Sequence, residues 1–211
     1  MTHPWHDVSP GKRTLDNVNA VIEISRGGTV KYELDKPTGM LRMDRVLYSA
    51  VHFPANYGFI PQSLGEDHDP LDILVLCQFA VHPMTLIEAR PIGVMTMVDA
   101  GRNDHKIIAV AVEDPEYNTY RAIDQLPEHR LRTITRFFRD YKTLEKAKVD
   151  VQEVNPSEQA CEIIDQAIDR YRDWQADKRE MSDKREMSDK RYVSDQRYVS
   201  DERGVSDEAS A

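Results

Sequence analysis

The sequence predicts a mainly β fold, a small antiparallel barrel of short strands with flanking helices and a repetitive C-terminal tail. Three observations support this fold class. Runs rich in Val and Ile recur between turn residues through the first 125 residues, with few helical patterns among them. Two amphipathic helical patterns follow. From residue 177 onward the chain repeats every six residues.

The expected strands are the apolar runs bounded by turn residues. They cover residues 20–24, 30–34, 41–46, 73–76, 86–97 and 107–112. The tripeptide Arg26-Gly27-Gly28 supplies a turn between the first two runs, which is consistent with a β-hairpin there.

Two helices are expected after the strands. Within residues 126–143, apolar side chains recur at three- and four-residue spacing, namely Leu131, Ile134, Phe138 and Tyr141. The second helix is expected to begin near residues 155–158, where Asn, Pro and Glu stand in the order typical of a helix N-terminus. Its apolar face is formed by Ala160, Ile164, Ala167, Tyr171 and Trp174.

The tail, residues 177–211, consists of hexapeptides such as DKREMS and DKRYVS. A six-residue step advances about 600° around a helix, so its apolar residues form no continuous stripe. We therefore expect a disordered or weakly helical tail, with a coiled-coil or stacked-repeat role as the alternative. Residues 1–176 then form the folded domain.

The composition excludes several classes of protein. The net charge is −9, which argues against general attraction to nucleic acid or to an anionic membrane surface. Two cysteines do not support a disulfide scaffold, and no apolar run is long enough for a transmembrane helix. The N-terminus does not resemble a signal peptide, so we expect a cytoplasmic protein.

An acidic motif precedes the strand at residues 73–76. Asp67, Asp69 and Asp72 fall within six residues, and crowded carboxylates require cations or protons among them. Oxygen ligands favour a hard cation such as Mg²⁺. A calcium EF-hand is excluded because its glycine and its final glutamate are replaced by Asp72 and Gln78. A solvated acidic loop is the simpler alternative.

Two further groups of residues favour a metal site over a solvated acidic loop. Residues 99–106 add Asp99, Asp104 and Lys106 in another expected turn. Cationic and phenolic side chains suited to phosphate oxygens occur elsewhere, at Lys31, Arg45, Tyr57, Tyr141 and Lys142. Each has an ordinary structural explanation alone. Together they indicate a site that holds several metal ions and a polyanion, which points to phosphoryl transfer to water.

The chain closely resembles the soluble family I inorganic pyrophosphatases from about residue 21 to residue 146. The Asp67-x-Asp69-Pro70-Leu71-Asp72 signature is specific to that family. The matching blocks occur in the family's order: VIEIS, VKYELDKPTG, DRVLYSAVHFPANYGFIPQSL, EDHDPLDILVL, ARPIGVMTMVD, DHKIIAV and FFRDYKTLEK. The rival functions are a Mg²⁺-dependent hydrolase of another anhydride and a non-catalytic binding domain of the same fold.

The resemblance implies a five-stranded OB-like barrel and Mg²⁺-dependent hydrolysis of pyrophosphate to two phosphates. It assigns metal binding to Asp67, Asp72, Asp99 and Asp104. It assigns acceptance of the proton from the attacking water to Asp69. The phosphate-binding groups would be Lys31, Arg45, Tyr57, Lys106, Tyr141 and Lys142.

The remaining implications concern supporting residues and assembly. Glu23 and Glu33 match acidic positions near the rim of the site. The chain departs from the pattern at Phe53, His68 and Ala100, without loss of the core set. A homo-oligomer is expected, with a hexamer favoured over a dimer.

Overall fold

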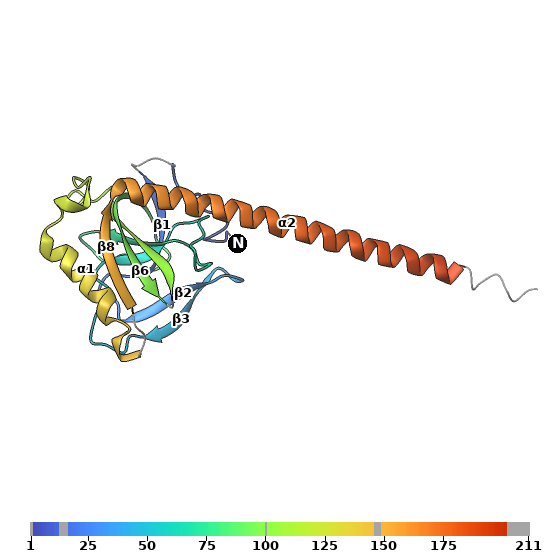
Figure 1. Cartoon of the computed structure of the whole chain (residues 1–211), viewed down its shortest axis with the longest axis horizontal. Coiled ribbons are helices and arrows are strands. Elements are labelled where there is room, and N and C mark those ends of the chain that lie inside the picture. Colours follow the sequence, from blue (N-terminus) through green and yellow to red (C-terminus); the bar gives the residue numbers. More distant parts are fainter. Residues whose placement is uncertain (1, 13–16, 100, 146–148, 202–211) are drawn as a thin grey trace, which may run out of the picture. The chain divides into compact units, whose positions relative to one another are not determined.

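The computed structural model describes residues 2–12, 17–99, 101–145 and 149–201 (Figure 1). They form eight strands, two α-helices and two short 3₁₀ segments. The strands are β1 (Val18–Ile24), β2 (Val30–Asp35), β3 (Met40–Val46), β4 (Asn56–Phe59), β5 (Asp72–Leu76), β6 (Leu86–Asp99), β7 (Arg102–Ala111) and β8 (Val149–Pro156). The helical elements are η1 (Ile123–Gln125), α1 (Glu128–Asp140), η2 (Thr143–Glu145) and α2 (Ser157–Asp201).

Five strands pair in a closed ring. The order β1-β4-β5-β7-β6 is completed by pairing of β6 with β1. This ring confirms the expected five-stranded OB-like barrel. One pair, β5 with β7, is parallel, so the barrel is not wholly antiparallel. Strand β8 adds to the outer edge of β6, and β2 and β3 form a separate two-stranded sheet.

The expected hairpin between the first two strands is wrong. The ladders of the described residues pair β2 with β3, whereas the partners of β1 are β4 and β6. A turn does form at Gly27 and Gly28, but it does not join paired strands. Instead, Gly27 N–H donates to the carbonyl of Phe53 at 2.8 Å. Phe53 N–H in turn donates to the carbonyl of Gly28 at 3.0 Å. The turn therefore ties β2 to the segment before β4.

The central strands are buried on both faces. In β5, Ile73 and Val75 belong to one apolar cluster, and Leu74 and Leu76 belong to the other. The first cluster includes residues of α2, and the second includes residues of α1. Burial on both faces explains why this strand reads as an unbroken apolar run.

Gly58 permits the close contact between β4 and β1. A Cβ atom at this position would lie 1.9 Å from the carbonyl oxygen of Val21. The backbones can approach only because glycine has no side chain. The same strand carries Tyr57 toward the functional site, so this contact fixes one wall of that site.

The chain divides into two compact units, Met1–Tyr171 and Arg172–Ala211. For residues 177–201 the helical form of the expected disordered or weakly helical tail is the one observed, because α2 continues to Asp201. This stretch contains neither Gly nor Pro, and the Glu180–Lys184 pair at 2.6 Å has the favourable i,i+4 spacing. Residues 202–211 lie outside the described part. The proposed domain boundary at residue 176 stays a prediction.

Among the described helices, none has a stretch that is long and apolar enough to cross a bilayer.

Candidate active site

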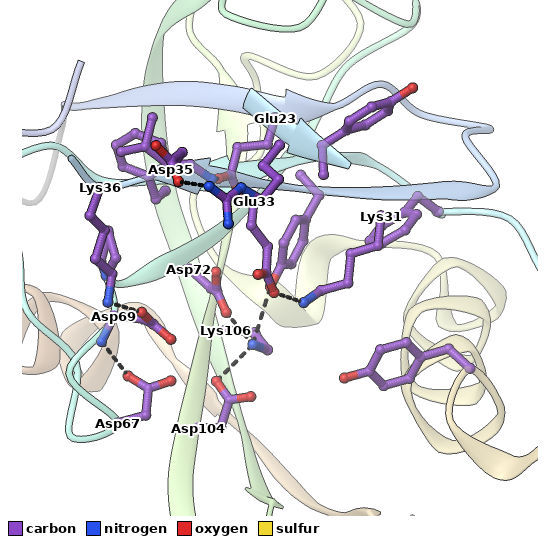
Figure 2. A pocket seen from close by; sticks show the side chains of 18 of the residues that line it. Glu23, Lys31, Glu33, Asp35, Lys36, Asp67, Asp69, Asp72, Asp104 and Lys106 are labelled. Carbon is purple, nitrogen blue, oxygen red and sulfur yellow. Dashed lines mark hydrogen bonds and ion pairs between the residues drawn. The ribbon is translucent and has the colours of Figure 1, made fainter. Parts of the chain in front are cut away.

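One cavity of about 530 Å³ gathers most of the expected site residues (Figure 2). Its walls come from β2, β4, the acidic loop (residues 66–71), the starts of β5 and β7, and the C-terminal end of α1. The expected residues that line it are Glu23, Lys31, Glu33, Tyr57, Asp67, Asp69, Asp72, Asp104, Lys106, Tyr141 and Lys142.

Lys106 lies at the centre of the acidic wall. It is the register partner of Asp72 across the parallel β5–β7 pair, and it shares a strand face with Asp104 two residues earlier. Its ammonium hydrogen-bonds to the carboxylate of Asp72, lies 2.7 Å from Asp104 Oδ1 and donates to Tyr57 Oη at 3.2 Å. Figure 2 shows the two carboxylates converging on this group.

The buried environment shifts the pKa values of this group. Lys106 is only 4% exposed, and burial opposes its charge. The neighbouring Asp72, Tyr57 and Asp104 outweigh that effect and hold the pKa of Lys106 well above its usual value. For Tyr57, burial acts in the other direction and, followed by the charge of Asp72, raises the pKa of its hydroxyl. Lys106 is therefore a cation under physiological conditions.

The acidic loop holds Asp67 and Asp69 in a tight turn. The backbone N–H of Asp69 donates to Asp67 Oδ1 at 3.0 Å, and His68 between them has a φ of 69°. Burial, with the charges of Asp72 and Asp69, raises the pKa of Asp67. The side chain of Asp69 is 60% exposed toward the open side of the site.

Glu23 is the most deeply buried carboxyl of the site. It is 6% exposed, and its Oε1 accepts a hydrogen bond from the backbone N–H of Leu34 at 2.7 Å. Burial, together with the nearby charge of Asp72, raises the pKa of Glu23 to about 8. It therefore holds a proton across most of the neutral range in the metal-free protein.

The β2–β3 sheet presents cations at the rim. Lys31 pairs with Glu33 and lies 3.3 Å from Asp44. Arg45, the register partner of Lys31, lies outside the lining of the cavity, and its Nε donates to Glu145 Oε1 at 2.8 Å. Within the described part of the chain, Arg45 Nη2 is buried without a hydrogen-bond partner. One donor of this guanidinium thus has no protein acceptor among the described residues.

The end of α1 supplies the opposite wall. Tyr141 is buried, and burial raises the pKa of its hydroxyl. Lys142 Nζ lies 5.5 Å from the centre of the Tyr141 ring. Phe53, one of the departures from the family pattern, packs against Tyr57 and Phe137 with ring centres 5.3 and 4.8 Å apart.

The acidic residues fit a hard divalent cation by the chemistry of their donors. Asp67, Asp72 and Asp104 offer carboxylate oxygens on one cavity, and burial raises the pKa of both Asp67 and Asp72. A bound cation would offset the unfavourable free energy of burying these ionised carboxylates. As the described side chains stand, no three acidic, His or Cys groups are already arranged around a metal position. Lys106 occupies the space between Asp72 and Asp104.

The metal ligands expected from the sequence also include Asp99, which Ala100 follows. The backbone of Asp99 ends β6, opposite Arg102 on β7, but its side chain is outside the described set. Ala100 lies outside the described residues. The metal role expected for Asp99 stays a prediction.

The sequence analysis missed Lys36. Its ammonium pairs with the carboxylate of Asp69, and it lines the cavity next to Asp35 and Pro37. The available signal was a charged turn directly after the strand that carries Lys31. That signal does not show that the turn approaches the acidic loop, because the two segments are 30 residues apart along the chain.

Comparison with known proteins identifies the family. The family model described as inorganic pyrophosphatase matches residues 20–172. Soluble inorganic pyrophosphatase 1 of Arabidopsis thaliana is 51% identical over 172 residues, which cover 82% of this chain and 81% of the relative. Soluble inorganic pyrophosphatase 2 of Chlamydomonas reinhardtii is 51% identical over 172 residues, covering 82% and 90% of the two chains. The solved inorganic pyrophosphatase of Helicobacter pylori is 40% identical with a TM-score of 0.73, covering 76% of this chain and 96% of that one. The chain belongs to the inorganic pyrophosphatase family.

Proposed function

We propose that this chain hydrolyses inorganic pyrophosphate to two orthophosphates with Mg²⁺ as its cofactor. The observation that carries the proposal is the convergence of Asp67, Asp69, Asp72 and Asp104 with lysine and tyrosine side chains on one cavity, in a member of this family. Such a site can neutralise a compact polyanion and hold the acids needed for metal binding.

Asp67, Asp72 and Asp104 are the proposed metal ligands in the described cavity, and Asp99 is a further candidate. When bound, Mg²⁺ would acidify a water molecule and neutralise charge on the phosphates. The carboxylates must be ionised for this role, and a bound cation would offset the burial that raises the pKa values of Asp67 and Asp72.

Asp69 is the proposed general base. Its exposed carboxylate lines the cavity and pairs with Lys36, and its backbone N–H is fixed by the hydrogen bond to Asp67 Oδ1. It would take the proton of the attacking water, a role that typically contributes about 10²–10⁴-fold in rate.

The phosphate groups would be held by donors from three walls. Lys106 and Tyr57 come from the barrel, and Lys31 and Arg45 come from the β2–β3 sheet. Tyr141 and Lys142 come from the end of α1. Donors from opposed walls can align the two phosphates with the attacking oxygen. Glu33 would orient Lys31 through their ion pair, and Glu23 would support the floor beside Leu34.

Phosphate release by wild-type protein and by Asp69→Asn tests the proposal. The variant should fold normally and lose at least about 100-fold in kcat, because the base is removed. Asp165→Asn, on the exposed face of α2, is the matched control and should match wild type. Equal rates for Asp69→Asn and wild type would contradict the role of Asp69. Faster hydrolysis of nucleoside triphosphates than of pyrophosphate would favour the rival anhydride hydrolase.

A homo-oligomer, with a hexamer favoured over a dimer, and a cytoplasmic location complete the proposal. The support for assembly is the resemblance of the chain to the family. Light scattering on the purified protein should give a mass several times that of one chain. A monomer mass would contradict the assembly.

A further inference from the structure

Lys36 makes contacts that the proposed catalytic roles do not use. It follows β2 directly, and its ammonium pairs with the carboxylate of Asp69 (Figure 2). The same ammonium donates to the backbone carbonyl of His68 at 3.0 Å. One side chain from the β2–β3 turn thus contacts both the carboxylate of Asp69 and the His68 carbonyl that precedes it.

The N-terminal strap, residues 3–7, holds Lys36 from the other side. Lys36 Nζ lies 5.8 Å from the centre of the Trp5 ring, within the range of a cation–π contact. His3 Nδ1 accepts hydrogen bonds from the backbone N–H groups of Trp5 and His6, at 3.2 and 3.3 Å. Its Nε2 therefore carries the proton and donates to the carbonyl oxygen of Lys36 at 2.9 Å.

The strap is itself anchored to the segment that leads into the acidic loop. Trp5 is 1% exposed, and its indole Nε1 donates to the carbonyl of Ser63 at 2.9 Å. The backbone N–H of Gln62 donates to the carbonyl of Trp5 at 2.9 Å. The hydroxyl of Ser63 accepts from the N–H of Leu71 at 2.9 Å. The contacts therefore run from the strap to both ends of the acidic loop.

We propose that Lys36, held by the N-terminal strap, is a positioning residue that fixes the carboxylate of Asp69 for proton transfer. The inference rests on the proposed function and adds to it a residue and a segment without an assigned role. Asp69 needs such a restraint because its side chain is exposed, and exposed carboxylates sample several rotamers. A base out of reach of the attacking water does not take its proton.

Steady-state kinetics of Lys36→Met, Lys36→Arg and the control Lys184→Met test this role. Lys184 pairs with Glu180 on α2, far along the chain from the loop. We expect Lys36→Met to lower kcat about tenfold, a part of the general-base contribution, with KM for magnesium pyrophosphate within about twofold of wild type. Lys36→Arg should recover at least half of the lost kcat. A higher KM with unchanged kcat would overturn the proposal in favour of direct phosphate binding.

A double-mutant cycle tests whether Lys36 acts through Asp69. In the Asp69→Asn background, Lys36→Met should have no further effect on kcat. A second tenfold loss there would overturn the proposal. Thermal melts establish that each variant is folded. If wild type releases no phosphate, the proposed function fails; if wild type is active and Lys36→Met matches it, only this inference fails.

Discussion

The buried carboxyl of Glu23 predicts a specific dependence of stability on pH in metal-free protein. Its pKa is about 8 when folded, against an ordinary value of 4.5. Between these values the folded protein retains a proton that the unfolded chain releases. The free energy of unfolding must therefore fall as pH rises from 4.5, and the loss is complete above about pH 8.

Glu23→Gln removes this titration and retains an oxygen that can accept from Leu34 N–H. Each pH unit between the two pKa values changes the unfolding free energy by about 1.4 kcal/mol. Over the interval from 4.5 to about 8, the difference reaches roughly 3–5 kcal/mol. The group is almost fully buried, so solvent screening reduces this figure little. The variant should thus be the more stable protein at pH 8.

Urea unfolding of wild type and Glu23→Gln in excess chelator, at pH 5 and pH 8, measures this difference. We expect the two proteins to differ little at pH 5, whereas at pH 8 the variant should be more stable by several kcal/mol. Glu162→Gln, on an exposed face of α2, is the control and should follow wild type at both pH values. The same difference in unfolding free energy between Glu23→Gln and wild type at pH 5 and at pH 8 would refute the reasoning.

Two further changes have defined outcomes. Lys106→Met should lower kcat more than about 100-fold and destabilise metal-free protein by about 3 kcal/mol, since it leaves Asp72 and Asp104 facing each other without a cation. Urea unfolding midpoints equal to those of wild type would contradict this. A chain ending at Gln175 should keep kcat and oligomer size while losing the circular-dichroism signal of the removed part of α2. A change in oligomer size would assign the tail a role in assembly.

The sequence predicted β1, β5, β6 and β7 from runs rich in β-branched residues, and β2 and β3 from apolar residues between turn signals. It missed two strands, β4 and β8. Strand β4 contains Asn56 and Gly58, and its placement depends on the contact between Gly58 and the carbonyl of Val21. Strand β8 mixes acidic residues with Val and ends in Pro156, and among the described strands it pairs with β6 alone. Pairing of this kind is decided by the tertiary fold.

The tail shows what the period of a repeat leaves open. A six-residue repeat places no apolar stripe on a helix, and this led to the expectation of a disordered or weakly helical tail. Ion pairs such as Glu180–Lys184 and the absence of Gly and Pro support helix formation locally, without a packed face. Local propensity was the better guide for these residues.

The sequence could predict the kind of site, a metal and phosphate site, because that chemistry depends on residue types. Crowded aspartates with phosphate donors have few other uses, and the fold brings Asp72, Asp104 and Lys106 together by strand register. The sequence does not reveal that Lys36 reaches Asp69, since that contact depends on how the β2–β3 turn meets the acidic loop. Nor does it show that Trp5 supports the contact from the N-terminus.

Phosphate release from pyrophosphate by purified protein, with Mg²⁺ and with excess chelator, tests the proposed function most directly. We expect rapid release of two phosphates per pyrophosphate with Mg²⁺, and no release above the uncatalysed rate in chelator. Absence of release in both conditions, from protein shown to be folded, would contradict the proposed hydrolysis. Equal release in both conditions would contradict the proposed dependence on a divalent metal.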